Sequence, residues 1–78
     1  MAQLPNSDWL VQSSGSMIFI VNRHTEEELV KADATDRNAV AKAQYTIYTL
    51  EVLTAEDKCF AHFWFGYFYA HLAGGDEG

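Results

Sequence analysis

The chain has 78 residues, enough for one domain and too few for a second folding unit or a large catalytic scaffold. Hydrophobic residues make up 49% of the chain and aromatic residues 14%, a composition that supports a packed core and excludes intrinsic disorder. Eleven acidic residues against five basic ones give a net charge of −6, which disfavours direct binding to nucleic acid or to an anionic membrane. We therefore expect a basic partner.

The single cysteine, Cys59, excludes a disulfide within the chain and favours a reducing, intracellular setting. The first twenty residues lack a basic leader followed by an apolar run, so we expect no signal peptide. The longest apolar stretch, residues 59–72, is interrupted by two histidines and a glycine and falls short of the roughly 18 residues that span a bilayer. These features predict a soluble, cytoplasmic protein without a membrane segment.

The N-terminal part of the chain predicts a β-hairpin. Residues 1–7 are expected to be an irregular lead-in. Trp9–Val11 and Met17–Val21 are rich in β-forming residues, and the small polar cluster Ser13–Ser16 between them suits a tight reversal. Because Met17–Val21 is apolar throughout, we expect that strand to be covered on both faces.

A short surface helix is expected after the hairpin. Thr25 is a suitable N-cap, and Glu28 follows at the spacing of a capping box. This helix should end near Asp33. A second helix start is expected at Thr35 or Asp36, where an apolar stripe begins.

Residues 45–53 admit two interpretations. Most of them are β-branched or aromatic, and this composition favours a strand over 45–53. Apolar residues at helical spacing instead favour one long helix over 36–53, and no glycine or proline interrupts that range. The residues that carry this helical spacing are Val40, Ala43, Ile47 and Leu50.

The C-terminal segment predicts a helix over residues 55–73. Thr54 and Asp57 form an N-terminal capping pattern, and Gly74-Gly75 supplies a stop. Aromatic residues cover most of its circumference, so it is either the central helix of the fold or part of an oligomer interface. The whole chain, 1–78, is thus predicted to be one compact α+β domain with irregular tails at 1–7 and 74–78. The alternative is a mostly α fold with residues 36–53 helical.

Candidate chemistry is limited to one pair of side chains. Cys59 and His62 lie three residues apart and would share a helix face, the spacing of a two-ligand clip or of a thiol beside a base. A structural zinc site needs about four ligands, and His24 and His71 do not complete a second pair. No third group to orient a catalytic histidine is evident. We expect no metal, no cofactor and no catalytic residue, and therefore not an enzyme.

Acidic residues are concentrated in one short part of the chain. On a short helix and the turn after it they would form a contiguous negative patch that docks on a basic surface, such as a groove that normally holds nucleic acid. The alternative interpretation is an ordinary solvated helix face. The candidate partner-binding residues are Glu26, Glu27, Glu28, Asp33 and Asp36.

In size, negative charge, lone cysteine and the acidic segment 25–33 (Thr-Glu-Glu-Glu-Leu-Val-Lys-Ala-Asp), the chain resembles the small acidic proteins of phages and mobile elements, anti-CRISPR inhibitors among them. The resemblance implies a non-enzymatic inhibitor in the cytoplasm of a bacterial host. Such an inhibitor would bind a CRISPR effector complex and block DNA binding or nuclease recruitment. Many members of that class place carboxylates where phosphates would lie. The class shares no motif, so the resemblance assigns no functional residue.

A second function class remains open. The aromatic helix over 55–73 is also typical of a small structural or assembly subunit, because aromatic residues are enriched at interface hot spots. In that case the helix would pack against a second copy of the chain in a homodimer or against a larger partner.

Overall fold

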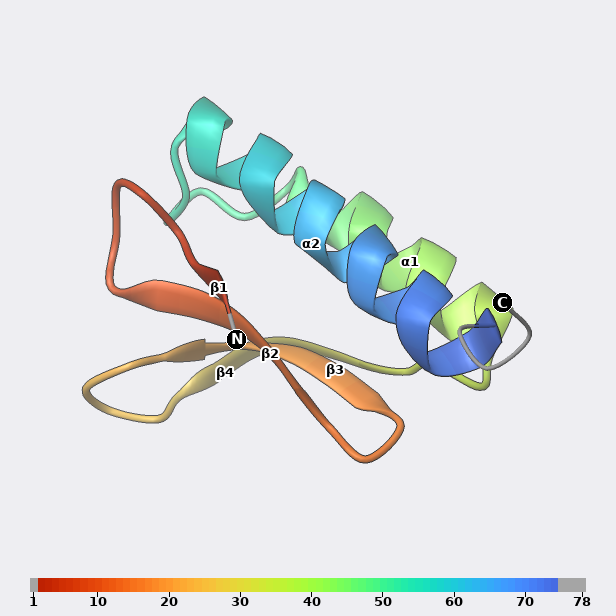
Figure 1. Cartoon of the computed structure of the whole chain (residues 1–78). Coiled ribbons are helices and arrows are strands. Elements are labelled where there is room, and N and C mark those ends of the chain that lie inside the picture. The colour runs from red at the N-terminus through yellow and green to blue at the C-terminus, as the bar shows by residue number, and fades with distance from the viewer. Residues whose placement is uncertain (1, 75–78) are drawn as a thin grey trace.

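The computed structural model describes the backbone of residues 2–74 and the side chains as far as Leu72. Its elements are β1 (Ala2–Gln3), β2 (Trp9–Ser14), β3 (Met17–Asn22), β4 (Glu28–Asp33), α1 (Arg37–Ile47) and α2 (Ala55–Gly74). The four strands form one antiparallel sheet in the order β1-β2-β3-β4. Both helices lie on the same face of that sheet (Figure 1), so the predicted α+β fold is confirmed.

The predicted N-terminal hairpin is confirmed as β2 and β3. Ser14 pairs with Met17, which leaves Gly15 and Ser16 as a two-residue connection. Gly15 has φ of 61°, while Ser16 does not have a positive φ, the pattern of a type II′ turn. A glycine at the first central position takes this conformation without strain, and the turn fixes the register of the hairpin.

The core lies between the sheet and the two helices. Ile18 and Ile20 of β3 are fully buried on the helix side, whereas Phe19 and Val21 on the opposite face are only half-buried. The expectation that β3 is covered on both faces is therefore wrong, because both helices pack on one face. The buried residues that meet between the layers include Val11, Ile18, Ile20, Val30 and Ala32 of the sheet and Val40, Ala43, Ile47, Ala61 and Phe65 of the helices.

The predicted short helix over 25–33 is wrong, since residues 28–33 form the strand β4. The Asn22 side chain accepts hydrogen bonds from the backbone N–H groups of His24 (2.8 Å) and Thr25 (3.0 Å), which closes a turn. The Thr25 hydroxyl accepts from the N–H of Glu27 at 3.3 Å, so the residue predicted to cap a helix supports this turn instead. β4 then pairs with β3, with a bulge where the register shifts between Ile20 and Val21.

α1 begins where the second helix start was expected. The carboxylate of Asp36 caps it by accepting from the N–H groups of Asn38 (3.1 Å) and Ala39 (3.2 Å). The favoured strand over 45–53 is wrong, and the alternative helix over 36–53 is too long, because α1 ends at Ile47. The chain then passes through turns to Thr54.

α2 confirms the predicted C-terminal helix. The Thr54 hydroxyl accepts from the N–H of Asp57 at 3.1 Å, as the capping pattern predicted. α2 lies alongside α1, where a Cβ added at Gly66 would sit 3.2 Å from Nε2 of Gln44. The limits of the two tails need correction: Ala2–Gln3 forms β1, and Gly74 belongs to α2, while residues 75–78 lie outside the described residues.

Candidate functional site

The five predicted partner-binding residues lie in β4 and in the segments on either side of it. β4 is an edge strand of the sheet. Glu26 and Glu27 belong to the turn before β4, Glu28 is its first residue and Asp33 its last, and Asp36 caps the helix that follows. The predicted acidic helix face is therefore wrong, because no helix forms there. The acidic residues instead form two groups, one at each end of a six-residue strand. A strand of this length separates them by about 17 Å.

The three glutamates are the more available of the two groups. They are exposed, and within residues 2–74 none of their carboxylates accepts a hydrogen bond or forms an ion pair. Glu26 has φ of 63°, a left-handed conformation that is uncommon for glutamate, and its N–H donates to the carbonyl of Asn22 at 2.8 Å. The turn thus presents three adjacent carboxylates to solvent.

The two aspartates at the other end of β4 also have structural roles. Thr35 donates its backbone N–H (2.9 Å) and its hydroxyl (2.7 Å) to Oδ1 of Asp33. The backbone bond, followed by the hydroxyl bond, holds the pKa of the Asp33 carboxyl below its usual value. Asp36 uses its own Oδ1 to cap α1. Any contact with a partner would therefore involve carboxylates that are already oriented by the fold.

Cations lie near the same edge, so its charge is mixed. Four of the five basic residues belong to β4, α1 or the segments next to them, namely Arg23, Lys31, Arg37 and Lys42. The Arg23 guanidinium donates to Oε1 of Gln3 at 3.3 Å and so reaches toward β1, at the opposite edge of the sheet. Lys31 lies in the middle of β4. The edge is thus acidic at both ends of the strand and basic at its centre.

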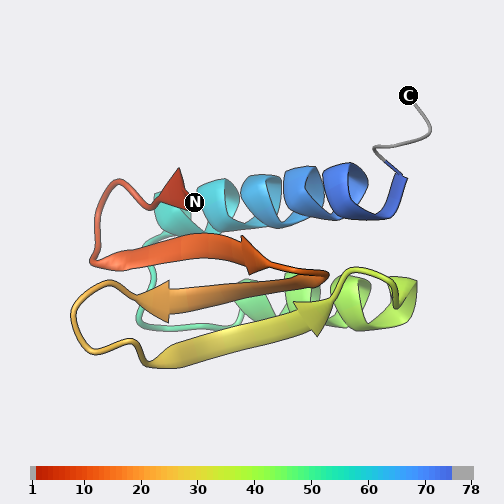
Figure 2. The same ribbon diagram turned by 60° about the horizontal axis from the view of Figure 1, so that its bottom comes forward.

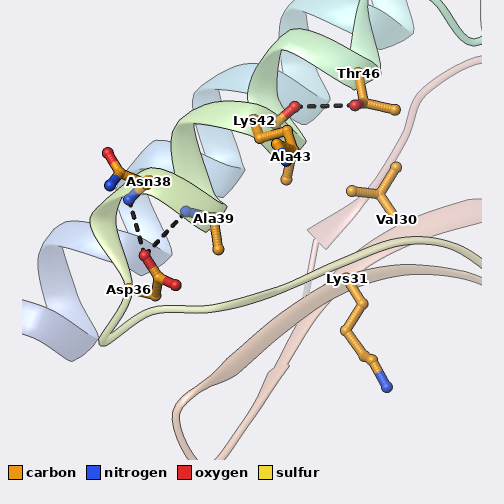
Figure 3. Close-up of a pocket in the computed structure, with 8 residues that line it drawn as sticks. All are labelled: Val30, Lys31, Asp36, Asn38, Ala39, Lys42, Ala43 and Thr46. Carbon is orange, nitrogen blue, oxygen red and sulfur yellow. Dashed lines mark hydrogen bonds between the residues drawn. The ribbon is translucent and has the colours of Figure 1, made fainter.

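A cleft of about 420 Å³ runs between β4 and α1 (Figure 3). Val30 points into it toward the helix, whereas the Lys31 side chain points away. The lining residues are Val30, Lys31, Asp36, Asn38, Ala39, Lys42, Ala43 and Thr46. The cleft therefore combines a short apolar floor with polar and charged groups from the exposed side of α1.

A second cleft, of about 520 Å³, lies on the sheet face that the helices leave open. Its apolar part is formed by Leu10, Phe19 and Val21, and its rim includes Arg23 and two of the three glutamates, Glu26 and Glu28. Figure 2 shows the sheet from the side that the helices do not cover. The turn that carries Glu26, Glu27 and Glu28, which we call the acidic turn, thus borders a partly apolar surface.

α2 exposes an aromatic surface, and Trp64 connects it to the core, against which that side chain packs. Phe60, Phe63 and Tyr67, spaced three and four residues apart, are 42%, 61% and 48% exposed. The Trp64 ring lies edge-on to Phe63 and to Tyr67, with centroid distances of 5.4 and 5.3 Å, and His71 stacks on Tyr67. We call Phe60, Phe63, Trp64, Tyr67 and His71 the aromatic flank. It joins several rings into one surface.

Cys59 and His62, the candidate pair for chemistry, both lie in α2. Cys59 is an exposed free thiol, while His62 is half-buried and lies with its ring 5.2 Å from that of Tyr48. Within the described part of the chain, no three His, Cys, Asp or Glu side chains come together in a way that could hold a metal ion.

Asp57 is a buried carboxylate that sequence reasoning did not single out. It is fully buried in the first turn of α2, and its Oδ1 accepts from the backbone N–H of Asn6 at 3.0 Å and from Nδ2 of Asn6 at 3.3 Å. Oδ2 has no hydrogen-bond partner among residues 2–74. The contact joins segments fifty-one residues apart. Asp57 was predicted only as part of a capping pattern, and no local signal in the sequence shows that Asn6 would bury it.

Comparisons with protein-family models, with curated proteins and with solved structures found no match to this chain. Among residues 2–74 no helix combines the length and apolar character needed to cross a membrane.

Proposed function

We propose that this protein is a non-enzymatic inhibitor that works by occupancy, docking its acidic sheet edge on a basic surface of a nucleic-acid-handling partner. The specific partner that we propose is a CRISPR effector complex in the cytoplasm of a bacterial host. Occupation of its basic groove would block DNA binding or nuclease recruitment. The observation that carries the proposal is the gathering of Glu26, Glu27 and Glu28 as exposed, uncompensated carboxylates at one end of the free edge strand β4.

The arrangement also supports rapid, salt-sensitive association. The glutamates lie on a turn that projects from the end of the sheet (Figure 2). Complementary charge raises association rates and is screened by salt, and the net charge of −6 steers the chain toward cations over longer distances.

The test is a double charge reversal, Glu27→Lys with Glu28→Lys, measured as association kinetics with purified CRISPR effector complexes at low and high salt. We expect the reversal to slow association by about tenfold and to flatten its salt dependence. Glu51→Lys with Glu77→Lys is the matched control, because it changes the net charge equally at residues outside β4 and its turn. Equal association rates for the two double variants would contradict docking through the acidic turn.

A second candidate function is supported by the aromatic flank. Three large aromatic side chains remain 42–61% exposed, and such residues are enriched at interface hot spots. The chain would then be an assembly subunit that self-associates through α2. Sedimentation at micromolar concentration tests this candidate: a dimer that Phe63→Ser with Tyr67→Ser converts to monomer supports it, and a wild-type monomer contradicts it.

A further inference from the structure

β4 leaves one side of its backbone unpaired. It is six residues long and pairs only with β3, whereas the strand at the opposite edge, β1, has two residues. Edge strands of this length usually carry a device against strand addition, such as a charged residue. β4 carries Glu28 and Asp33 at its ends, a bulge where the register shifts between Ile20 and Val21, and Lys31 near its centre, whose side chain points away from the cleft between β4 and α1 (Figure 3). From Val30 to Asp33 the pairing with β3 is regular, and this part of the edge is the part that an added strand could use.

The orientation of the free backbone groups follows from the register. The N–H of Ala34 donates to the carbonyl of Ser16 at 2.7 Å. Hydrogen-bonded pairs alternate along an antiparallel ladder, so the backbone groups of Ala32 and Val30 also face β3. The N–H and C=O of Lys31, and the N–H of Asp33, therefore face away from the sheet. No residue in the described part of the chain bonds to the outward groups of Lys31.

The surface beside β4 could accommodate the side chains of an added strand. One face of that strand would lie over the cleft, where Val30, Ala39 and Ala43 form a small apolar floor. Its other face would lie beside Glu28 and Asp33 at the two ends of β4. Edge strands that lie beside a helix bind extended peptides in this way, with backbone hydrogen bonds for affinity and alternate side chains for specificity.

Charge distinguishes between two possible added strands, β4 of a second copy of this chain and a basic segment of a partner. If β4 paired antiparallel with β4 of a second copy, the two registers of longest overlap would place like charges opposite each other. One register sets Lys31 opposite Lys31, and the other sets Asp33 opposite Glu27. Both copies also carry a net charge of −6. A second copy is therefore disfavoured. A segment with a basic residue near each end and small apolar residues on alternate positions matches both the acidic ends of β4 and the cleft.

We propose that the partner inserts an extended segment of this chemistry as a fifth strand beside β4, with its apolar side chains in the cleft between β4 and α1. This inference rests on the proposed function, since it assigns the part of the basic partner that the acidic edge recognises. Backbone pairing holds the segment, and the carboxylates at the two ends of β4 select its basic residues.

The test uses a fluorescent seven-residue probe with arginine at both ends and alternating valine and threonine between them. Two further probes carry backbone N-methyl groups on alternate residues, each blocking one edge of the extended peptide. We expect the unmodified probe to bind and to slow hydrogen exchange at the Lys31 amide. We also expect one N-methylated probe to bind normally and the other to lose binding, because only one edge faces β4.

A variant of the protein provides the reciprocal test. Lys31→Pro removes the outward N–H and is compatible with an edge strand, so the sheet itself should persist. Its matched control, Lys31→Thr, removes the charge and keeps the N–H. We expect Lys31→Pro to weaken binding of the probe by about tenfold, the effect of losing backbone hydrogen bonds, and Lys31→Thr to retain it. Thermal melts establish whether both variants fold. If either variant does not fold, the N-methylated probes test strand addition on the unmodified protein.

The outcomes separate this inference from the proposed function. Equal binding of both N-methylated probes, abolished by Glu27→Lys with Glu28→Lys, overturns strand addition and leaves electrostatic docking in place. Edge-selective binding that the charge reversal does not change supports strand addition and contradicts the acidic turn. Absence of binding by the unmodified probe overturns strand addition.

Discussion

The β4 edge and the aromatic flank of α2 are both uncovered, but they offer a partner different interactions. At β4 the backbone N–H and C=O of Lys31 face outward, between carboxylates at both ends of the strand. Within α2 the helix satisfies its own backbone, so the flank offers only side chains, and these are aromatic. Backbone and charge give directional, salt-sensitive recognition, whereas exposed rings give apolar area that salt does not screen.

This small fold places its two kinds of uncovered surface on different elements. α2 buries one side against the sheet through Ala61 and Phe65 and presents Phe63 to solvent. β4 buries Val30 and Ala32 and presents its outer backbone edge. A measurement of partner binding against salt and another of self-association against concentration therefore address different faces of the molecule.

The largest expected effect on stability distinguishes two phenylalanines of α2, Phe65 and Phe63. Phe65 is fully buried, so Phe65→Ala should lower the free energy of unfolding by about 3–5 kcal/mol. Phe63 is 61% exposed, so Phe63→Ala should change it by less than about 0.5 kcal/mol. Denaturant melts at several protein concentrations test both variants. A large, concentration-dependent loss for Phe63→Ala would show that the flank is buried between copies, and the contrast with β4 would then fail.

The next effect concerns how α2 is fixed to the N-terminal segment. Asp57→Ala leaves the backbone N–H of Asn6 without its acceptor and should cost about 2 kcal/mol of unfolding free energy. Asp57→Asn keeps an oxygen in the place of Oδ1 and should cost less. Urea denaturation measures both. Equal destabilisation by the two variants would mean that the charge of Asp57, rather than its acceptor oxygen, holds the segment.

Elements with strong local signals could be predicted from the sequence. The β2–β3 hairpin was predicted from the small polar cluster that contains Gly15, and α2 from Thr54 and Asp57. The strand over 45–53 was predicted wrongly because β-branched and aromatic residues were weighed above the helical spacing. The alternative helix over 36–53 was predicted too long because α1 ends without a glycine. Its last turn is closed instead by hydrogen bonds such as that from the Thr49 hydroxyl to the carbonyl of Thr46 at 2.7 Å.

The candidate site shows where local patterns mislead. Thr25 and Glu28 fit a capping box, yet the turn closed by Asn22 and pairing with β3 determine the structure of this segment. A signal for the strand was present, since Val30, Ala32 and Ala34 are buried and alternate with polar residues. The acidic residues were identified correctly as neighbours in sequence, but their division between the two ends of β4 depends on tertiary pairing.

A prediction of intermediate size separates structure from docking at Asp36. Asp36→Ala removes the N-cap of α1 and should cost about 1 kcal/mol of unfolding free energy. Asp36→Asn retains an N-cap of similar strength and removes the charge. Thermal unfolding and binding to the effector complex are measured on both variants. Weaker binding by Asp36→Asn at unchanged stability assigns a docking role to the carboxylate, and unchanged binding restricts Asp36 to capping.

The smallest expected effect is a pH dependence at the far end of β4. The pKa of Asp33 lies below its ordinary value of 3.8 because Thr35 donates its backbone N–H and then its hydroxyl to the carboxylate. A lowered pKa in the folded state adds stability that is complete above the unfolded-state pKa and is lost as the pH falls through the folded-state pKa. Thr35→Val removes the hydroxyl and keeps the N–H, so the Asp33 pKa should rise but stay below its ordinary value. Carboxyl NMR titration measures this shift, and Asp33→Asn provides the control without a titrating group. An Asp33 pKa at or above the ordinary value in the unmodified protein would show that Thr35 does not hold this carboxylate, and the docking role of this end of β4 would then depend on a freely moving side chain.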